Sequence, residues 1–168
     1  TQGLASNEVQ DLAIDAAGNA WFGTSEGLSR RAPDGRFTTF TSADGLVGDN
    51  IQALAVAGGG SLWVGTYDGL SRRKADGSWD TPLAGQAVMA LAVGADGVVW
   101  AGTAGEGVAR LAPEGVTWYT QASTAGGLPH NYVYALATDA EGRVWAGTEV
   151  GLARRELNGN WITDRTSD

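Results

Sequence analysis

The sequence predicts an all-β fold built from four similar four-stranded antiparallel sheets. Three observations lead to this prediction. A Trp-x-Gly-Thr phrase occurs four times in 168 residues, with its tryptophans at Trp21, Trp63, Trp100 and Trp145. The same order of apolar runs and glycine turns surrounds each copy, and no segment shows the apolar spacing of an amphipathic helix. Repetition at this spacing is typical of solenoids, propellers and arrays, so four copies predict four repeated structural units.

Each repeat contains four short apolar segments separated by turns. The expected first strands cover 9–15, 51–57, 88–94 and 133–139, and the Trp-x-Gly-Thr strands cover 20–24, 62–66, 99–103 and 144–148. The third strands follow at 28–32, 70–74, 108–112 and 152–156, and the fourth at 36–40, 78–82, 116–120 and 160–166. Asp-Gly and Asn-Gly pairs between strands three and four are strong hairpin signals, because tight hairpin turns need positive φ. Each repeat therefore predicts a four-stranded meander.

The first strand of the second repeat is apolar on both faces. Simple alternation places Ile51, Ala53 and Ala55 on one face and Leu54 and Val56 on the other. A strand buried on both faces belongs to a sheet packed between two others. Four small sheets packed face to face describe the blades of a β-propeller, and an up-and-down barrel is the alternative. We expect the four repeated tryptophans to be core residues packed against the next blade, with the glycine two residues later making room for a neighbouring ring.

Two stretches resemble a known repeat. Residues 3–31, GLASNEVQDLAIDAAGNAWFGTSEGLSRR, and 127–155, GLPHNYVYALATDAEGRVWAGTEVGLARR, resemble the two-component regulator propeller repeat. The second repeat departs from it at Asp49 and in the turn 57–60, and the third at Gln86 and in 105–108. The resemblance extends over the chain as one propeller unit, residues 1–168, with repeats at approximately 3–44, 45–81, 82–126 and 127–168.

The resemblance implies a sensor role without a catalytic residue. Such repeats form periplasmic or extracellular regions of two-component regulators, where the propeller binds a ligand or a protein partner. It implies the same location for this chain and a role in signal transduction. It supplies no cofactor and no metal site.

Oxygen-bearing side chains are expected together at one end of the blades. In a meander, the loop entering strand one and the loop between strands two and three lie at the same end of the sheet. The candidate ligand-binding residues in these loops are Asn7, Glu26, Asp49, Asp68, Gln86, Glu106, His130, Asn131 and Glu149. They suit a small polar ligand or a protein partner. The alternative is ordinary turn chemistry, since Asp, Asn and Glu beside glycine are common turn residues.

Composition excludes several functions. Nineteen acidic and eleven basic residues give a net charge of −8, which disfavours nucleic acid as a partner. No apolar stretch is long enough to cross a membrane, and there is no cysteine for thiol chemistry. Streptogramin lyase, a propeller enzyme whose family uses histidines, a carboxylate and magnesium, is the enzyme alternative. This chain has one histidine, His130, so we expect no enzyme activity.

Two further expectations concern surfaces. The pairs Arg30–Arg31, Arg72–Arg73 and Arg154–Arg155 are interpreted as third-strand residues near an outer edge, with their heads in solvent or in local salt bridges. The second expectation is self-association. Four in-phase blades leave no strand to lock a ring, so the leading prediction is a homodimer that closes eight blades. A closed four-bladed monomer, a piece of a larger ring, and a purely structural or engineered assembly unit are the alternatives.

Overall fold

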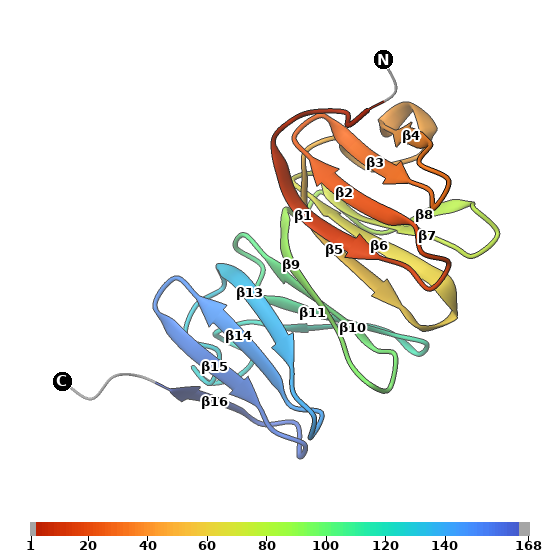
Figure 1. The fold of residues 1–168 in the computed structure, drawn as a ribbon. Helices are drawn as coiled ribbons and strands as arrows, with labels where there is room; N and C mark the ends of the chain where they lie inside the picture. Colours follow the sequence, from red (N-terminus) through yellow and green to blue (C-terminus); the bar gives the residue numbers. More distant parts are fainter. Residues whose placement is uncertain (1–2, 165–168) are drawn as a thin grey trace. The chain divides into compact units, whose positions relative to one another are not determined.

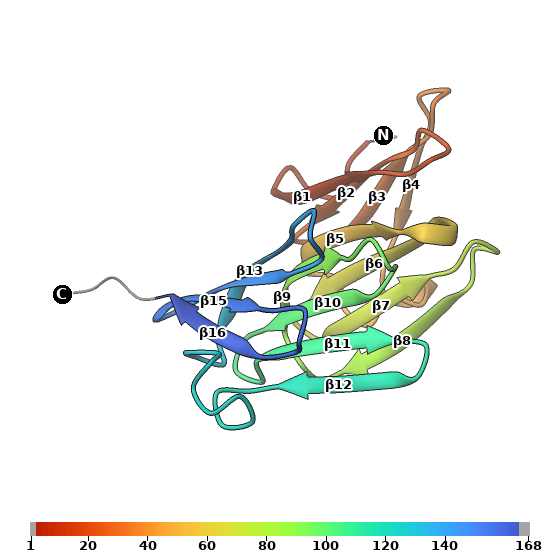
Figure 2. The same ribbon diagram turned by 90° about the horizontal axis from the view of Figure 1, so that it is seen from below.

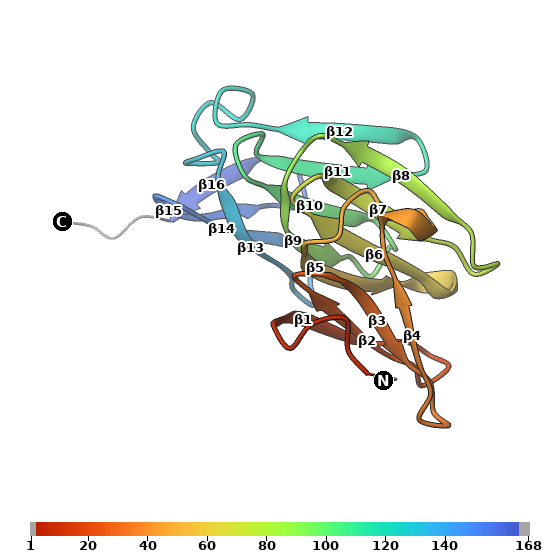
Figure 3. The ribbon, with the colours of Figure 1, turned by 90° about the horizontal axis from the view of Figure 1, so that it is seen from above.

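The computed structural model describes residues 3–164, and it folds as four separate four-stranded antiparallel sheets (Figure 1). In each sheet the strands lie in chain order, as Figures 2 and 3 show for β9–β12 and β1–β4. The prediction of an all-β chain with four four-stranded blades is confirmed. Helical structure in the described residues is confined to two three-residue 3-10 turns, η1 (Ser42–Asp44) and η2 (Gly58–Gly60).

The strands match the expected segments closely. The first two blades are β1 (Val9–Ile14), β2 (Ala20–Thr24), β3 (Gly27–Arg31) and β4 (Phe37–Phe40), then β5 (Ile51–Ala57), β6 (Ser61–Thr66), β7 (Gly69–Arg73) and β8 (Trp79–Ala84). The others are β9 (Val88–Val93), β10 (Val99–Thr103), β11 (Val108–Ala112) and β12 (Gly115–Tyr119), then β13 (Val133–Thr138), β14 (Val144–Thr148), β15 (Gly151–Arg155) and β16 (Trp161–Asp164). Residues 165 and 166 of the expected last strand lie outside the described residues.

The chain divides into two compact units. The first, Thr1–Val88, contains the blades β1–β4 and β5–β8, and the second, Met89–Asp168, contains the blades β9–β12 and β13–β16. Each unit has its own hydrophobic core, formed where its two blades pack face to face. The pair of packed blades is therefore the structural unit that positions every site considered below.

The expectation of simple alternation in strand one is wrong at its first residue. Ile51 lies opposite Thr66 and Ala53 lies opposite Gly65, so Gln52 is an extra residue in a β-bulge. The bulge turns Ile51 to the face that carries Leu54 and Val56. The register shifts in the same way between Val9 and Asp11 and between Val133 and Ala135.

Each blade presents two different faces, and in both units one kind packs on the other. The face with the tryptophan and glycine of Trp-x-Gly-Thr is called the tryptophan face. The opposite face, with the first residue of strand one and the second arginine position of strand three, is called the arginine face. In the first unit Trp21 packs on Ile51 and Leu54 of the next blade, and Trp21 and Ile51 are buried. In the second unit Trp100 and Val133 share one core. The tryptophans thus have the predicted core role in these two interfaces.

The repeated glycine makes room for an aliphatic residue rather than the expected ring. A Cβ atom on Gly23 would lie 2.5 Å from Cγ2 of Ile51. A Cβ atom on Gly102 would lie 2.7 Å from Cγ1 of Val133. Real Cβ contacts are not this short, so both positions require glycine for the next blade to approach. The interface is a glycine socket filled by the first residue of the next strand one.

The expectation of a solvated edge or a local salt bridge for the arginine pairs is met in part. Arg72 pairs with Asp80 and Arg154 with Glu156, but the guanidinium groups also lie over aromatic rings. The first arginine lies over the tryptophan of its own blade, with Cζ 5.3 Å from the ring centroid for Arg72 and Trp63. The second reaches the preceding blade: Arg73 lies 5.5 Å from both Trp21 and Phe40, and Arg155 lies 5.3 Å from Trp100. Burial lowers the pKa of Arg73, with a further contribution from the charge of Arg30. Guanidinium groups over aromatic rings therefore close the outer part of each interface.

Candidate functional site

The Trp-x-Gly-Thr threonines fix the loops that carry half of the predicted site. Thr24 Oγ1 donates a hydrogen bond to Gly27 O at 2.7 Å and accepts one from Glu26 N at 3.2 Å. Thr66 and Thr103 hold the loops of Asp68 and Glu106 in the same way. The other threonine hydroxyls donate hydrogen bonds as follows: Thr66 to Gly69 O, Thr103 to Gly107 O and Thr148 to Gly151 O. Position four of the phrase thus orders the loop between strands two and three.

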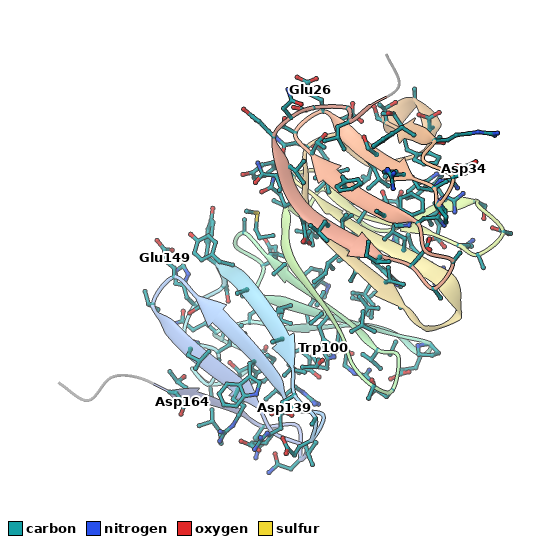
Figure 4. All side chains as sticks on the ribbon, in the orientation of Figure 1. Glu26, Asp34, Trp100, Asp139, Glu149 and Asp164 are labelled. Atoms are coloured by element: carbon teal, nitrogen blue, oxygen red, sulfur yellow. The ribbon has the colours of Figure 1, made fainter. Side chains whose placement is uncertain are left out.

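The two predicted loop sets meet at one end of the blades. Ser25 N donates to Glu8 O, Tyr67 N to Asn50 O, and Glu149 N to Tyr132 O at 3.1 Å. In Figure 4, Glu26 and Asp34 lie at opposite ends of β3, and Glu149 and Asp139 lie at opposite ends of β14. Asn7, Glu26, Asp49, Asp68 and Gln86 belong to the first unit, and Glu106, His130, Asn131 and Glu149 to the second.

Two of the predicted carboxylate and amide side chains are engaged in holding their own loops. Asp49 accepts hydrogen bonds from Ser42 N and Ser42 Oγ at 2.6 and 3.2 Å. Asn131 Oδ1 accepts one from Gln121 N at 2.7 Å. These contacts agree with turn chemistry at this repeat position. Glu26, Asp68, Glu106 and Glu149 remain exposed at the loop tips.

One group of side chains in the second unit combines aromatic and ionisable chemistry. We call it the Tyr–His cluster: His130, Tyr132, Tyr134 and Glu149. The ring centroids of His130 and Tyr132, and of Tyr132 and Tyr134, are each 6.0 Å apart. His130 Nδ1 accepts a hydrogen bond from Tyr132 N at 3.1 Å and lies 3.4 Å from Glu149 Oε2. Tyr134 is 51% exposed, so the cluster presents phenol rings and a carboxylate to solvent.

The residues predicted for this end of the blades included Tyr132 but did not include Tyr134. Tyr134 occupies the bulge position of β13, where the first two repeats have Gln10 and Gln52. The sequence distinguishes Tyr134 because it has a large aromatic side chain at a bulge position where the first two repeats have an amide. Tyr132 lies two residues after His130 in the predicted loop and forms an isolated antiparallel β-bridge with Ala104.

A cavity of about 510 Å³ lies at the other end of the second unit's blades, away from the predicted loops. Its walls are Trp100 and Tyr119, whose rings stack at 5.9 Å, together with Arg110 and Arg155. Figure 4 labels Trp100 on β10. Turn residues of both blades form the rim: Gly94, Ala95, Asp96, Ala140, Glu141 and Gly142. One position in the sequence marks this space: Gly94 stands six residues before Trp100, where two other repeats have Asp15 and Asp139 before their tryptophans.

The charged cavity side chains are partly committed to contacts. Arg110 Nη1 lies 2.6 Å from Glu114 Oε1, and this ion pair raises the pKa of Arg110. Arg155 lies over Trp100 and Tyr119, and its Nε is buried without a hydrogen-bond partner in the described residues. Arg155 is therefore foremost a packing residue of the blade interface.

Residues 3–164 contain neither a metal-binding cluster nor a membrane-spanning helix. No group of three His, Asp or Glu side chains in this range is arranged to hold a metal ion. No helix in the described part is long and apolar enough to cross a membrane.

Two segments of the chain match a known repeat. Residues 3–26 and 127–150 match the model of the two-component regulator propeller, and these segments are the ones that the motif singled out. No curated protein sequence is significantly similar to the chain.

Several solved structures share the fold. The extracellular domain of the candidate hybrid two-component system BT4673 from B. thetaiotaomicron matches with a TM-score of 0.80 and 22% identity, covering 99% of this chain and 22% of that one. Virginiamycin B lyase from Staphylococcus aureus matches with a TM-score of 0.73 and 15% identity, covering 94% and 55%. PorZ, a surface component of the type-IX secretion system of Porphyromonas gingivalis, matches with a TM-score of 0.72 and 18% identity, covering 93% and 27%. The chain thus spans about a fifth of the first of these proteins, and two of its segments match the two-component regulator propeller repeat.

Proposed function

We propose that this chain is a non-catalytic binding module of an extracellular or periplasmic sensor. The Tyr–His cluster carries the proposal, because exposed aromatic rings beside a carboxylate and an imidazole suit recognition of a polar ligand or a protein loop. The repeat match and the extracellular two-component neighbours support the sensor role and the location. The chain would then supply binding, and signalling would belong to other domains.

The absence of catalysis is part of the proposal. The cluster offers one imidazole, and its Nδ1 already accepts the backbone N–H of Tyr132. A general base needs an orienting partner and a reacting group within hydrogen-bond reach. The same Nδ1 atom lies 3.4 Å from Glu149 Oε2, and one ring nitrogen cannot both accept the Tyr132 N–H and donate to Glu149, so Glu149 does not orient His130 as a base in this arrangement. The lyase neighbour has 15% identity and supports the fold alone.

A ligand screen with matched variants tests the proposal. A panel of small polar compounds would be mixed with the chain, and binding and chemical conversion would be followed by ligand-detected NMR. We expect binding without turnover, and loss of binding in the Tyr132→Ala/Tyr134→Ala double variant. Tyr67→Ala is the control, since Tyr67 is 50% exposed in the equivalent loop region of the first unit.

Two outcomes would contradict the proposal. Turnover of a panel compound that disappears in His130→Ala would show that the chain is an enzyme. Binding that survives the double tyrosine variant but is lost in Ala95→Trp, at the rim of the 510 Å³ cavity, would place the site at the opposite end of the blades.

A second candidate function is assembly. The two terminal blades each leave one apolar face exposed, and this observation favours a chain whose partner is a further copy.

A further inference from the structure

The arginine face of the first blade is exposed although the equivalent face of the second blade is buried. Val9, Leu12 and Ile14 occupy the repeat positions of Ile51, Leu54 and Val56. Val9 is 40% and Leu12 60% exposed, whereas Ile51 and Leu54 are 0% and 7% exposed. Such a patch of contiguous aliphatic side chains on a soluble protein marks an interaction surface.

Two more residues of the first blade are exposed although their repeat equivalents are covered by a preceding blade. Leu4 precedes Val9 by five residues, as the buried Leu46 and Leu128 precede Ile51 and Val133, yet Leu4 is exposed. Arg31 stands at the repeat position of Arg73 and is exposed too. The first blade therefore carries every residue type with which the second and fourth blades cover a preceding tryptophan face: the leucine before strand one, the aliphatic residues of strand one and the second arginine of strand three.

The tryptophan face of the last blade is the complementary surface. Leu152 is 38% exposed, whereas Leu28 at its repeat position is fully buried. Trp145 is only partly buried. A Cβ atom on Gly147 would meet only Ala135 of the same blade, at 3.4 Å. The glycine socket that Ile51 and Val133 fill in the other interfaces is thus unfilled in this one.

The charge at the rim of this face also fits. The internal arginines lie over a tryptophan and a second ring from strand four, Phe40 or Tyr119. Register places Asp164 opposite Leu152, as Phe40 lies opposite Leu28, so the fourth-strand position of the last blade is a carboxylate. Asp164 is exposed on β16 (Figure 4). Arg31 of a second copy would meet the ring of Trp145 and the carboxylate of Asp164.

We propose that these two faces bind each other between two copies of the chain, head to tail. In each contact Val9 of one copy fills the socket over Gly147 of the other, and Arg31 lies over Trp145 beside Asp164. A second copy is the occupant because the chain carries both halves of the interface, with the unfilled socket on one face, the residues that fill such sockets on the other, and opposite charges on Arg31 and Asp164.

Solution mass tests the pairing. The 168-residue chain would be measured by sedimentation equilibrium across a wide concentration range. We expect the average mass to rise above the chain mass of 17.3 kDa as the concentration increases. A mass of 17.3 kDa at every concentration would overturn the proposal.

Two variants test the direction of pairing. Gly147→Val fills the socket, and Leu12→Lys charges the opposite face; neither residue touches the internal interfaces. We expect each to weaken pairing roughly thirtyfold or more, because both sit at the centre of the contact. An equal mixture should still form a pair through one intact contact, since one chain keeps the tryptophan face and the other the arginine face. Self-pairing of either variant at wild-type strength, or a mixture no stronger than its components, would overturn the head-to-tail contact.

A charge exchange tests the named ion pair. Arg31→Glu should weaken pairing by facing Asp164, and adding Asp164→Arg should restore it. Arg36→Glu is the matched control: Arg36 lies in the same blade, exposed beside Asp34 at 3.3 Å and away from the arginine face. Equal weakening by the control, or no recovery in the double variant, would remove the Arg31–Asp164 contact from the proposal. Circular dichroism confirms that every variant is folded.

Discussion

Asp15 and Asp139 connect the turn after strand one to the blade's tryptophan. Asp15 Oδ2 accepts from Trp21 Nε1 at 2.9 Å, and Asp139 Oδ2 accepts from Trp145 Nε1 at 2.8 Å. Each carboxylate also accepts backbone N–H groups of its own turn. In the second repeat Ala57 stands at this position, and Trp63 Nε1 is buried without a partner in the described residues.

The missing carboxylate predicts a stabilising substitution. A buried donor without a partner costs about 1–3 kcal/mol, so Ala57→Asp should raise the free energy of unfolding by about 1 kcal/mol. Urea unfolding measures the change. In a Trp63→Phe background the same substitution should give no gain. A gain of equal size in both backgrounds would show that the indole N–H is not the cause.

Acid should weaken the Asp139 contact. Burial raises the pKa of Asp139, but hydrogen bonds from Trp145 and Arg143 outweigh burial and lower it to about 2. The folded pKa lies below the unfolded value of 3.8, so the carboxylate stabilises the fold above pH 4 and loses this effect as the pH falls toward 2. Asp139→Asn should therefore be less stable than wild type at pH 7, with the difference shrinking between pH 4 and 2. A difference independent of pH would contradict this account.

The residue types in the repeat predicted the roles of many individual residues, but not of all of them. The four tryptophans were predicted as core residues because a large apolar ring at fixed spacing has few other uses. The glycine socket was misjudged, since glycine says only that a neighbour comes close and not which neighbour. Tyr134 was missed because its exposure depends on a bulge in β13.

At the scale of the element, the bulge in strand one decides which residues meet. Period-two alternation places Ile51 with Ala53, and the extra residue Gln52 reverses this. The strand boundaries and turns were predictable because Asp-Gly and Asn-Gly pairs punctuate the chain. The bulge was not, because no residue type in VQDLAI or IQALAVA demands it.

The second arginine of strand three should stabilise the blade interface. Arg73 lies over Trp21 and Phe40 of the preceding blade, so Arg73→Ala removes cation–π contact and apolar packing. We expect a loss of about 1–2 kcal/mol in the free energy of unfolding. Arg36→Ala, at an exposed turn, should change stability little. Equal losses from both would mean that Arg73 acts as a surface charge only.

At the scale of the whole molecule, the sequence predicted the four blades and their repeat type. It could not place the cavity beside Trp100, since the space depends on how turns of two blades meet. The end of the blades that carries the candidate loops follows from meander topology, which is why those residues could be grouped before the structure. Which of them bind a ligand depends on exposure and loop hydrogen bonds, and these separate Glu149 from Asn131.

The central claim is that one interface, a glycine socket filled by the first residue of strand one, operates both within the chain and between chains. Disulfide trapping tests it directly, because the chain has no cysteine of its own. Within the second unit, an ideal Cβ on Gly102 lies 3.1 Å from Cβ of Val133, close to the separation of about 3.5–4.5 Å that a disulfide needs. Gly102→Cys/Val133→Cys is therefore the internal control for bond formation.

The measurement mixes two single variants, Val9→Cys and Gly147→Cys, under mild oxidation. The account predicts a disulfide-linked product of 34.6 kDa, twice the chain mass of 17.3 kDa, that contains one chain of each variant, seen by mass spectrometry and absent when either variant is oxidised alone. If the internal control cross-links and the mixture does not, the two faces do not meet between copies, and the claim is wrong.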